Sequence, residues 1–175
     1  MAAVESHEPG SVAKIFSVAS AIDQGAVTPS SMFLVPGSFV FDPGTEFEQS
    51  IKDAYPHETE PMSVQQILVK SSNIGTMMAA ETIGVERLHE YLTSFGFGSA
   101  TALQYPAEST GTLRSVDRHR ASDKATITYG YGFAATSLQL MSAVNAGAYV
   151  GVHVPPPPDR PTIDENGHVM GAPVG

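Results

Sequence analysis

The chain contains no cysteine among its 175 residues, and it has no long apolar run. The absence of cysteine excludes disulfide bonds and thiolate metal sites, although it leaves the compartment open. No stretch approaches the roughly 18 apolar residues that a membrane-spanning helix needs, and residues 1–7 lack the charged and apolar regions of a secretion signal. We therefore expect a soluble chain without a targeting segment.

Basic residues are also scarce, with 9 Lys and Arg against 18 Asp and Glu and a formal net charge of −9. Because phosphate backbones are bound by clustered Lys and Arg, we expect no nucleic-acid partner. The apolar fraction of 42% is typical of a globular domain. A single domain of this length can bury roughly 70% of its unfolded surface, which is enough for a sizeable core.

Apolar residues recur at helical spacing through most of the chain. One helix is expected from Val12 to Ile22, between the Glu8-Pro9-Gly10 turn and Gly25. Residues 32–51 carry shorter apolar runs, which predict a small strand pair or an irregular loop. Further helices are expected at about 63–70, 74–83, 85–95 and 136–151, and two of them begin with the Ser/Thr-x-x-Gln pattern of a capping box, at Ser63 and Thr136.

The composition changes after residue 154. The run Pro155 to Pro158 imposes an extended passage, and Asn166-Gly167 is typical of a hairpin turn. We therefore divide the chain into a mainly helical part, residues 1–154, and a Pro-rich link that leads into a strand hairpin, residues 155–175.

Ser11 and Lys14 lie three residues apart at the start of the first predicted helix. Residues at this spacing share one face of a helix, so a neutral Lys14 amine could take the proton of the Ser11 hydroxyl. The lysine pKa would then have to fall from about 10.4 to roughly 7–8. The only source of desolvation that the sequence offers is the apolar neighbours Val12, Ile15 and Phe16.

Ser71-Ser72-Asn73 lies in a tight connection between two predicted helices. Taken alone, Ser and Asn at such a place are explained as helix caps, just as a lone Ser-x-x-Lys string is usually part of a helix surface. Taken together, the two motifs supply most parts of an acyl-transfer site. Ser71 can relay a proton to a leaving nitrogen, and the Asn73 amide can hold a substrate amide.

The sequence gives no sign of a metal or cofactor. The six histidines lack the paired spacing of a zinc site, and His57, near Glu58 and Glu60, is expected on an exposed turn. Gly130-Tyr131-Gly132 formally matches the start of a dinucleotide-binding turn, but no acidic residue follows about 20 residues later. We interpret this segment as a glycine turn that precedes a helix.

Several segments, in order, resemble the penicillin-binding proteins, and among them the septal class B D,D-transpeptidases of the FtsI type. The resemblance spans residues 8–155 and rests on Glu8-Pro9-Gly10-Ser11-Val12-Ala13-Lys14, Lys70-Ser71-Ser72-Asn73-Ile74-Gly75, Phe95-Gly96-Phe97-Gly98, Glu108-Ser109-Thr110-Gly111, Tyr129-Gly130-Tyr131-Gly132 and Thr136-Ser137-Leu138-Gln139-Leu140. It implies an α+β fold of the penicillin-binding-protein and β-lactamase-like class. This chain would hold the helix-rich part of that fold, with an incomplete central antiparallel sheet.

The resemblance also implies roles for four residues: Ser11 as the acylated nucleophile, Lys14 as its base, Ser71 as the proton shuttle and Asn73 as a substrate-binding residue. The implied enzyme cross-links peptidoglycan stem peptides in septal cell-wall synthesis and is acylated by β-lactam antibiotics. Its implied partners in the full-length protein include division-complex membrane proteins. Its implied place is the extracytoplasmic side of the cell membrane, through an anchor that this sequence does not contain.

The family's third motif, Lys-Ser/Thr-Gly, is missing, because none of the four lysines is followed by those residues. The strand that carries it supplies a backbone N–H to the oxyanion hole, and the loss of one such donor typically costs about 10²–10³ in rate. We therefore expect a fragment of a transpeptidase domain with little activity alone. Two alternatives stay open: a serine β-lactamase or D,D-carboxypeptidase, and a non-catalytic β-lactam sensor or division-complex scaffold.

Overall fold

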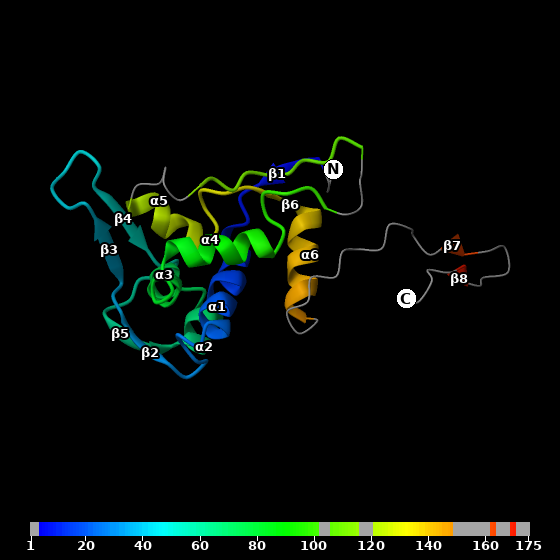
Figure 1. Ribbon diagram of the computed structural model, residues 1–175. Helices are drawn as coiled ribbons and strands as arrows, with labels where there is room; N and C mark the ends of the chain where they lie inside the picture. The colour runs from blue at the N-terminus through cyan, green and yellow to red at the C-terminus, as the bar shows by residue number, and fades with distance from the viewer. Residues whose placement is uncertain (1–3, 102–105, 116–120, 149–161, 164–168, 171–175) are drawn as a thin grey trace.

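The computed structural model describes residues 4–101, 106–115, 121–148, 162–163 and 169–170. At its centre lies helix α1 (Ala13–Asp23), which contacts α2 (Val64–Lys70), α3 (Asn73–Glu81), α4 (Val85–Ser94) and the 3₁₀ helix η3 (Ile127–Tyr129) (Figure 1). Helix α5 (Ala121–Thr126) leads directly into η3, and α6 (Ser137–Ala148) stands at one side of this group. The predicted helix-rich chain is confirmed.

The helix starts follow the local sequence, with one shift at the first helix. A 3₁₀ turn, η1 (Gly10–Val12), leads into α1, so Ser11 lies just before the α-helix rather than in its first turn. Both predicted capping boxes are present. Ser63 Oγ accepts from Gln66 N at 3.1 Å while Gln66 Oε1 accepts from Ser63 N at 2.8 Å, and Thr136 and Gln139 form the equivalent pair.

The strands form four separate antiparallel pairs in the described part of the chain. Strands β3 (Ser38–Phe41) and β4 (Gln49–Lys52) form a hairpin within the region where a strand pair was expected. Strand β2 (Met32–Val35) instead pairs with β5 (Glu60–Ser63), around that hairpin. Local patterns do not predict this second pairing, because the partners meet only after the intervening chain has folded.

Two further strand pairs are short. Strand β1 (Ser6–His7) pairs with β6 (Ala135–Thr136) and joins the N-terminal segment to the start of α6. Strands β7 (Thr162–Ile163) and β8 (Val169–Met170) pair with each other. The predicted Asn166-Gly167 turn and the Pro155–Pro158 passage lie outside the described residues.

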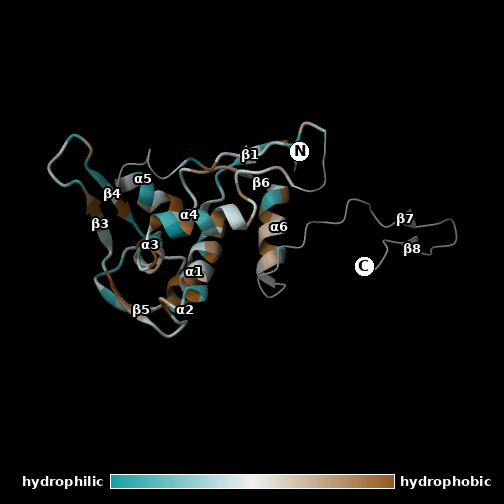
Figure 2. Cartoon of the chain, viewed as in Figure 1, coloured by the Kyte–Doolittle hydropathy of each residue, from teal (hydrophilic) through white to brown (hydrophobic). Residues whose placement is uncertain are grey.

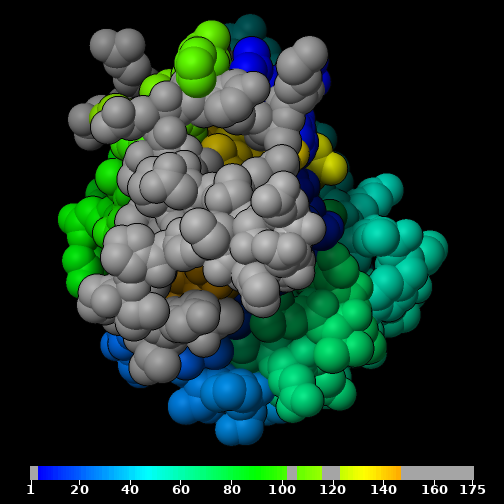
Figure 3. Space-filling view, turned by 90° about the vertical axis from the view of Figure 1, so that its right-hand side faces the viewer, coloured from blue at the N-terminus to red at the C-terminus, as the bar shows by residue number. Residues whose placement is uncertain are grey.

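Aromatic side chains from distant segments form the centre of the core. Phe16 of α1 packs edge-on against Phe97, with 5.2 Å between the ring centroids, and Phe97 packs against Phe133 at 5.4 Å. Each buried aromatic side chain contributes about 1.5–3 kcal/mol through its removal from water. Figure 2 shows apolar residues along α1 and α3 and polar residues in the loop between β3 and β4. The loop of this hairpin, coloured cyan, projects at the right-hand side of the view in Figure 3.

The Gln139 side chain, 1% exposed, holds together segments that are far apart in the sequence. Its Nε2 donates to the carbonyls of Ser99 and Thr110 at 2.7 and 2.9 Å, with a longer contact to Gly96 at 3.4 Å. Its Oε1 accepts from Thr136 N at 2.8 Å. We call Gln139 and these four partners the Gln139 clasp. Gly96, Thr110 and Thr136 each lie in one of the motif segments noted in the sequence, so the clasp connects three of those segments.

The described helices are also too short or too polar for a bilayer. Within the described ranges, none combines the length and the hydropathy that crossing a membrane requires.

Candidate functional site

The turn that carries Ser11 is fixed by a close backbone contact. Gly10 N donates to the carbonyl of Gly130 at 3.0 Å. Gly130 has a φ of +91°, and a Cβ at this position would lie 1.9 Å from the Gly10 carbonyl oxygen, so only glycine fits. The glycine turn predicted around residue 130 therefore positions the Ser11 turn. Ser11 itself is exposed, and its hydroxyl has no hydrogen bond within the described residues.

Lys14, in contrast, is only 2% exposed. Its Nζ donates to the Ser71 carbonyl at 2.5 Å and to the Ser71 hydroxyl at 3.0 Å. Ser71 follows α2 in the left-handed conformation, with φ 54° and ψ 41°, and this sharp turn directs both groups toward α1. The fold thus brings together Lys14 and Ser71, which are 57 positions apart in the sequence.

Burial lowers the pKa of Lys14 below its ordinary value of 10.5, and the nearby Asp53 carboxylate opposes this effect. The three apolar neighbours named from the sequence account for only part of this burial. Val12 and Ile15 are 42% and 52% exposed, and only Phe16 of the three predicted neighbours is buried. The Lys14 amine is desolvated mainly because α1 packs against the connection between α2 and α3, which a local sequence pattern does not contain.

Asn73 is the first residue of α3, directly after the N-cap Ser72. Its Nδ2 donates to the carbonyl of Lys52 at 2.9 Å, which ties the amide to the end of strand β4. No partner of its Oδ1 is found in the part of the chain that the structure describes. One N–H of the amide is therefore engaged by the protein, while Oδ1 is available to a substrate N–H.

Asp53 belongs to the same cluster, and sequence reasoning missed it. Its Oδ1 accepts from Asn73 N at 2.6 Å and from Ile74 N at 3.1 Å, so it satisfies two of the free N–H groups at the start of α3. Its Oδ2 lies 3.1 Å from His57 Nε2. Asp53 and Asn73 are 20 positions apart, and no spacing rule connects them.

The expectation that His57 is an exposed turn residue is wrong. Its side chain is 7% exposed and packs between Asp53 and Glu60, at 3.1 and 3.5 Å. The Tyr55 ring also packs against it, with 5.1 Å between the centroids. We call Lys14, Ser71, Asn73, Asp53 and His57 the Lys14 cluster. Among the described residues, no group of three or more His, Asp or Glu side chains is arranged to hold a metal ion.

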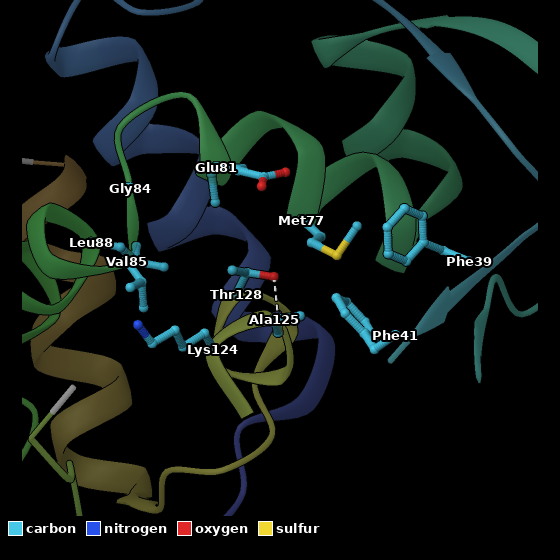
Figure 4. Close-up of a pocket in the computed structure, with 11 residues that line it drawn as sticks. Phe39, Phe41, Met77, Glu81, Gly84, Val85, Leu88, Lys124, Ala125 and Thr128 are labelled. Carbon is cyan, nitrogen blue, oxygen red and sulfur yellow. Dashed lines mark hydrogen bonds between the residues drawn. The ribbon is translucent and has the colours of Figure 1, made fainter. Parts of the chain in front are cut away.

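A separate apolar cavity of about 320 Å³ lies between the β3–β4 hairpin and helices α3, α4 and α5. Figure 4 shows Phe39, Phe41 and Met77 at one end of it and Lys124 at the other. None of the residues of the Lys14 cluster lines this cavity. It is therefore distinct from the polar groups described above.

Known proteins with similar sequences and structures come from one family. Residues 2–157 match the family model described as "Penicillin binding protein transpeptidase domain". Penicillin-binding protein PbpB of Mycolicibacterium smegmatis is 37% identical over 162 residues, which cover 93% of this chain and 24% of that protein.

Solved structures agree with the sequence matches. Penicillin binding protein 3 of Mycobacterium tuberculosis, complexed with aztreonam, has a TM-score of 0.84 at 32% identity, over 98% of this chain and 37% of that chain. A peptidoglycan synthetase from Bifidobacterium adolescentis has the same TM-score at 30% identity, over 98% of this chain and 31% of that chain.

These matches confirm the predicted fold class, in which helices are combined with small antiparallel strand pairs. The chain spans about a quarter of the length of the curated relatives PbpB that it matches. The family model covers most of the sequence, from the Ser11 turn through α6. The chain therefore belongs to the penicillin-binding protein transpeptidase family.

Proposed function

We propose that this chain is part of a peptidoglycan D,D-transpeptidase in which Ser11 is acylated by stem peptides and by β-lactams. One observation carries the proposal: a buried lysine with a lowered pKa, three residues after an exposed serine, contacts a second serine. These are the parts that an activated serine nucleophile needs. Family membership supports the reaction class, and the relative with bound aztreonam supports the choice of a β-lactam as probe.

The proposed reaction uses each side chain at one step. Ser11 Oγ attacks the carbonyl carbon of a D-Ala-D-Ala bond, and its proton passes to the neutral amine of Lys14. The proton moves on through the Ser71 hydroxyl to the nitrogen of the leaving D-alanine. The amine of a second stem peptide then attacks the ester carbonyl and returns one proton to Ser11 Oγ. Asn73 holds the substrate amide during both steps.

In the whole protein we propose a role in septal cell-wall synthesis, on the extracytoplasmic side of the cell membrane. Its partners there would be peptidoglycan stem peptides and division-complex membrane proteins, with β-lactams as inhibitors. The relatives' names and the family match support a cell-wall role. The site needs no cofactor in this proposal, because the Lys14 amine supplies the base.

The test is acylation by a labelled penicillin, followed by mass mapping of the adduct. Two proteins are compared: the 175-residue chain, and a longer protein that contains it together with a Lys-Ser/Thr-Gly segment. We expect labelling of Ser11 in the longer protein and slower labelling, by about 10²-fold or more, in the shorter chain. Ser11→Ala should abolish the adduct. Ser50→Ala, which removes another exposed hydroxyl, should not change it.

The alternatives give different results in the same assay. An adduct at Ser11 that is hydrolysed rapidly would favour a β-lactamase or a D,D-carboxypeptidase. A longer protein that folds but never reacts would favour a β-lactam-independent scaffold. An adduct on any residue other than Ser11 would contradict the proposed site.

A further inference from the structure

Asp53 contacts the start of helix α3 and its charge acts on the Lys14 amine, and each of its carboxylate oxygens has a separate task. Oδ1 accepts from the backbone N–H groups of Asn73 and Ile74. Oδ2 faces His57 Nε2. The Asp53 side chain has no exposed surface, so these contacts replace the water that a free carboxylate would have. The position of α3 therefore depends directly on where Asp53 is held.

His57 is placed so that it can hold Asp53. Its Nδ1 lies 2.7 Å from the carbonyl of Glu58, and its Nε2 lies 3.1 Å from Asp53 Oδ2. Both partners are acceptors, so each ring nitrogen that carries a proton donates to one of them. Gly37 fixes the backbone of this residue, since a Cβ at Gly37 would lie 1.9 Å from the His57 carbonyl oxygen.

Further charged groups extend outward from this pair in alternating sign. Glu60 Oε1 is 3.5 Å from His57 Nδ1 and 2.9 Å from Lys70 Nζ. Tyr55 packs on the His57 ring, with 5.1 Å between the centroids, and its hydroxyl is 3.4 Å from Glu60. Lys70 directly precedes Ser71. The chain of contacts thus begins and ends at the connection that carries Ser71 and Asn73.

We propose that Asp53 and His57 form a positioning pair for the acyl-transfer site: Asp53 holds the start of α3, and with it Ser71 and Asn73, against Lys14, while His57 orients Asp53. The consequence for catalysis rests on the proposed function. Neither residue touches the reacting atoms. A base that is misplaced by a fraction of an ångström relative to its partners loses rate steeply, which gives such a pair its effect.

The Asp53 charge makes a prediction with a definite sign. The Asp53 carboxylate raises the pKa of Lys14, against the larger lowering by burial. Removal of that charge should therefore lower the pKa of Lys14 further. A purely structural role would change the amount of folded protein and leave the Lys14 titration unchanged.

The experiment measures two quantities that do not depend on acylation. The first is the titration of Lys14 by NMR of labelled lysine side chains, which is practical because the sequence contains only four lysines. The second is the hydrogen exchange of the Asn73 and Ile74 amides. The variants are Asp53→Asn, His57→Gln, which keeps a donor for Asp53, and His57→Ala, which removes that donor. Glu58→Gln, an exposed carboxylate on the same loop, is the matched control.

We expect His57→Gln to leave both the Lys14 titration midpoint and amide exchange nearly unchanged, because a donor to Asp53 remains. We expect Asp53→Asn to lower that midpoint and to speed exchange of the Asn73 and Ile74 amides by about tenfold or more. His57→Ala should speed exchange, because it removes the donor that orients Asp53. The control should change neither exchange nor the midpoint.

The second-order acylation rate by labelled penicillin is then measured across pH on the longer protein. Its midpoint should shift in the same directions as the Lys14 titration. If neither exchange nor the Lys14 midpoint responds to the His57 and Asp53 variants, the positioning pair is refuted, whatever the acylation result. If both respond but Ser11 is never acylated in any variant, the proposed function fails instead. Should Asp53→Asn not fold, the two His57 variants decide between these outcomes.

Discussion

The two buried polar networks of this molecule differ in how completely their groups are satisfied. In the Gln139 clasp, one neutral amide uses both its nitrogen and its oxygen on backbone partners. In the Lys14 cluster, charged groups are packed together, and the adjacent Ser11 hydroxyl has no partner within the described residues. A satisfied neutral network fixes a fold. A desolvated amine near a hydroxyl that has no hydrogen-bond partner has the properties of a general base.

The contrast teaches how to separate motif segments that look alike in sequence. Both Lys14 and Gln139 are buried polar residues that resemble family positions. Lys14 has a lowered pKa and lies three residues after the exposed Ser11, the proposed nucleophile. The Gln139 side chain meets backbone groups alone, namely three carbonyls and the N–H of Thr136. The first residue should therefore control reactivity and the second should control stability.

The largest effect is expected for Lys14→Met, which tests whether Lys14 controls reactivity rather than stability. If Lys14 is the base, acylation of Ser11 in the longer protein should fall by about 10²–10⁴-fold. The free energy of unfolding should change by less than about 1 kcal/mol, because the lost hydrogen bonds are offset by the removal of a buried amine. Rates come from penicillin labelling and stability from urea unfolding. Lys124→Met is the control, and a similar loss of rate there would remove the special role of Lys14.

Substitution of Gln139, at the centre of the other network, should lower the stability and leave the acylation rate nearly unchanged. Gln139→Ala leaves the N–H of the buried Thr136 without its partner, together with the carbonyls of Ser99 and Thr110, whose bonds to Gln139 are partly buried. We expect a loss of about 3 kcal/mol or more in urea unfolding. The acylation rate per folded molecule should stay within about threefold of the original. The exposed Gln65→Ala should be nearly neutral, and an equal loss in both variants would contradict the clasp.

Gly130→Ala tests the backbone contact between the Ser11 turn and the glycine turn at residue 130. The added Cβ meets the Gly10 carbonyl, so we expect both a destabilisation of more than about 2 kcal/mol and a slower acylation of Ser11. Gly25→Ala is the matched control, because Gly25 also has positive φ but a Cβ there meets nothing within 4 Å. If the two variants behave alike, backbone strain alone explains the result and the Ser11 turn does not depend on Gly130.

The smallest predicted effect is the pH dependence of the original protein. Only neutral Lys14 can accept the Ser11 proton, so the acylation rate should fall up to tenfold for each unit of pH below the Lys14 pKa. Since burial lowers that pKa, the fall should begin below the ordinary value of 10.5 for lysine. A rate profile from pH 5 to 10 measures the midpoint. A profile that is flat throughout this range while Lys14 titrates within it would exclude Lys14 as the base.

Local sequence patterns predicted the parts of the fold that depend on neighbouring residues. The capping boxes at Ser63 and Thr136 form as expected, since each needs only a side chain three residues away. The tight connection at Ser71 is also where the pattern placed it. The pairing of β2 with β5 and the burial of His57 were not predicted, because they depend on contacts between segments separated by a folded hairpin.

The sequence by itself determined the candidate nucleophile and base, the Ser71-Ser72-Asn73 connection, the helical content and the family resemblance. The tertiary structure decided that Val12 and Ile15 do not shield Lys14, that Ser71 does contact it, and that Asp53 holds the start of α3. The physical reason is the separation along the sequence of the residues that interact. Caps and helical faces are set by residues within one turn, whereas desolvation and charge balance depend on which distant segments pack around a group.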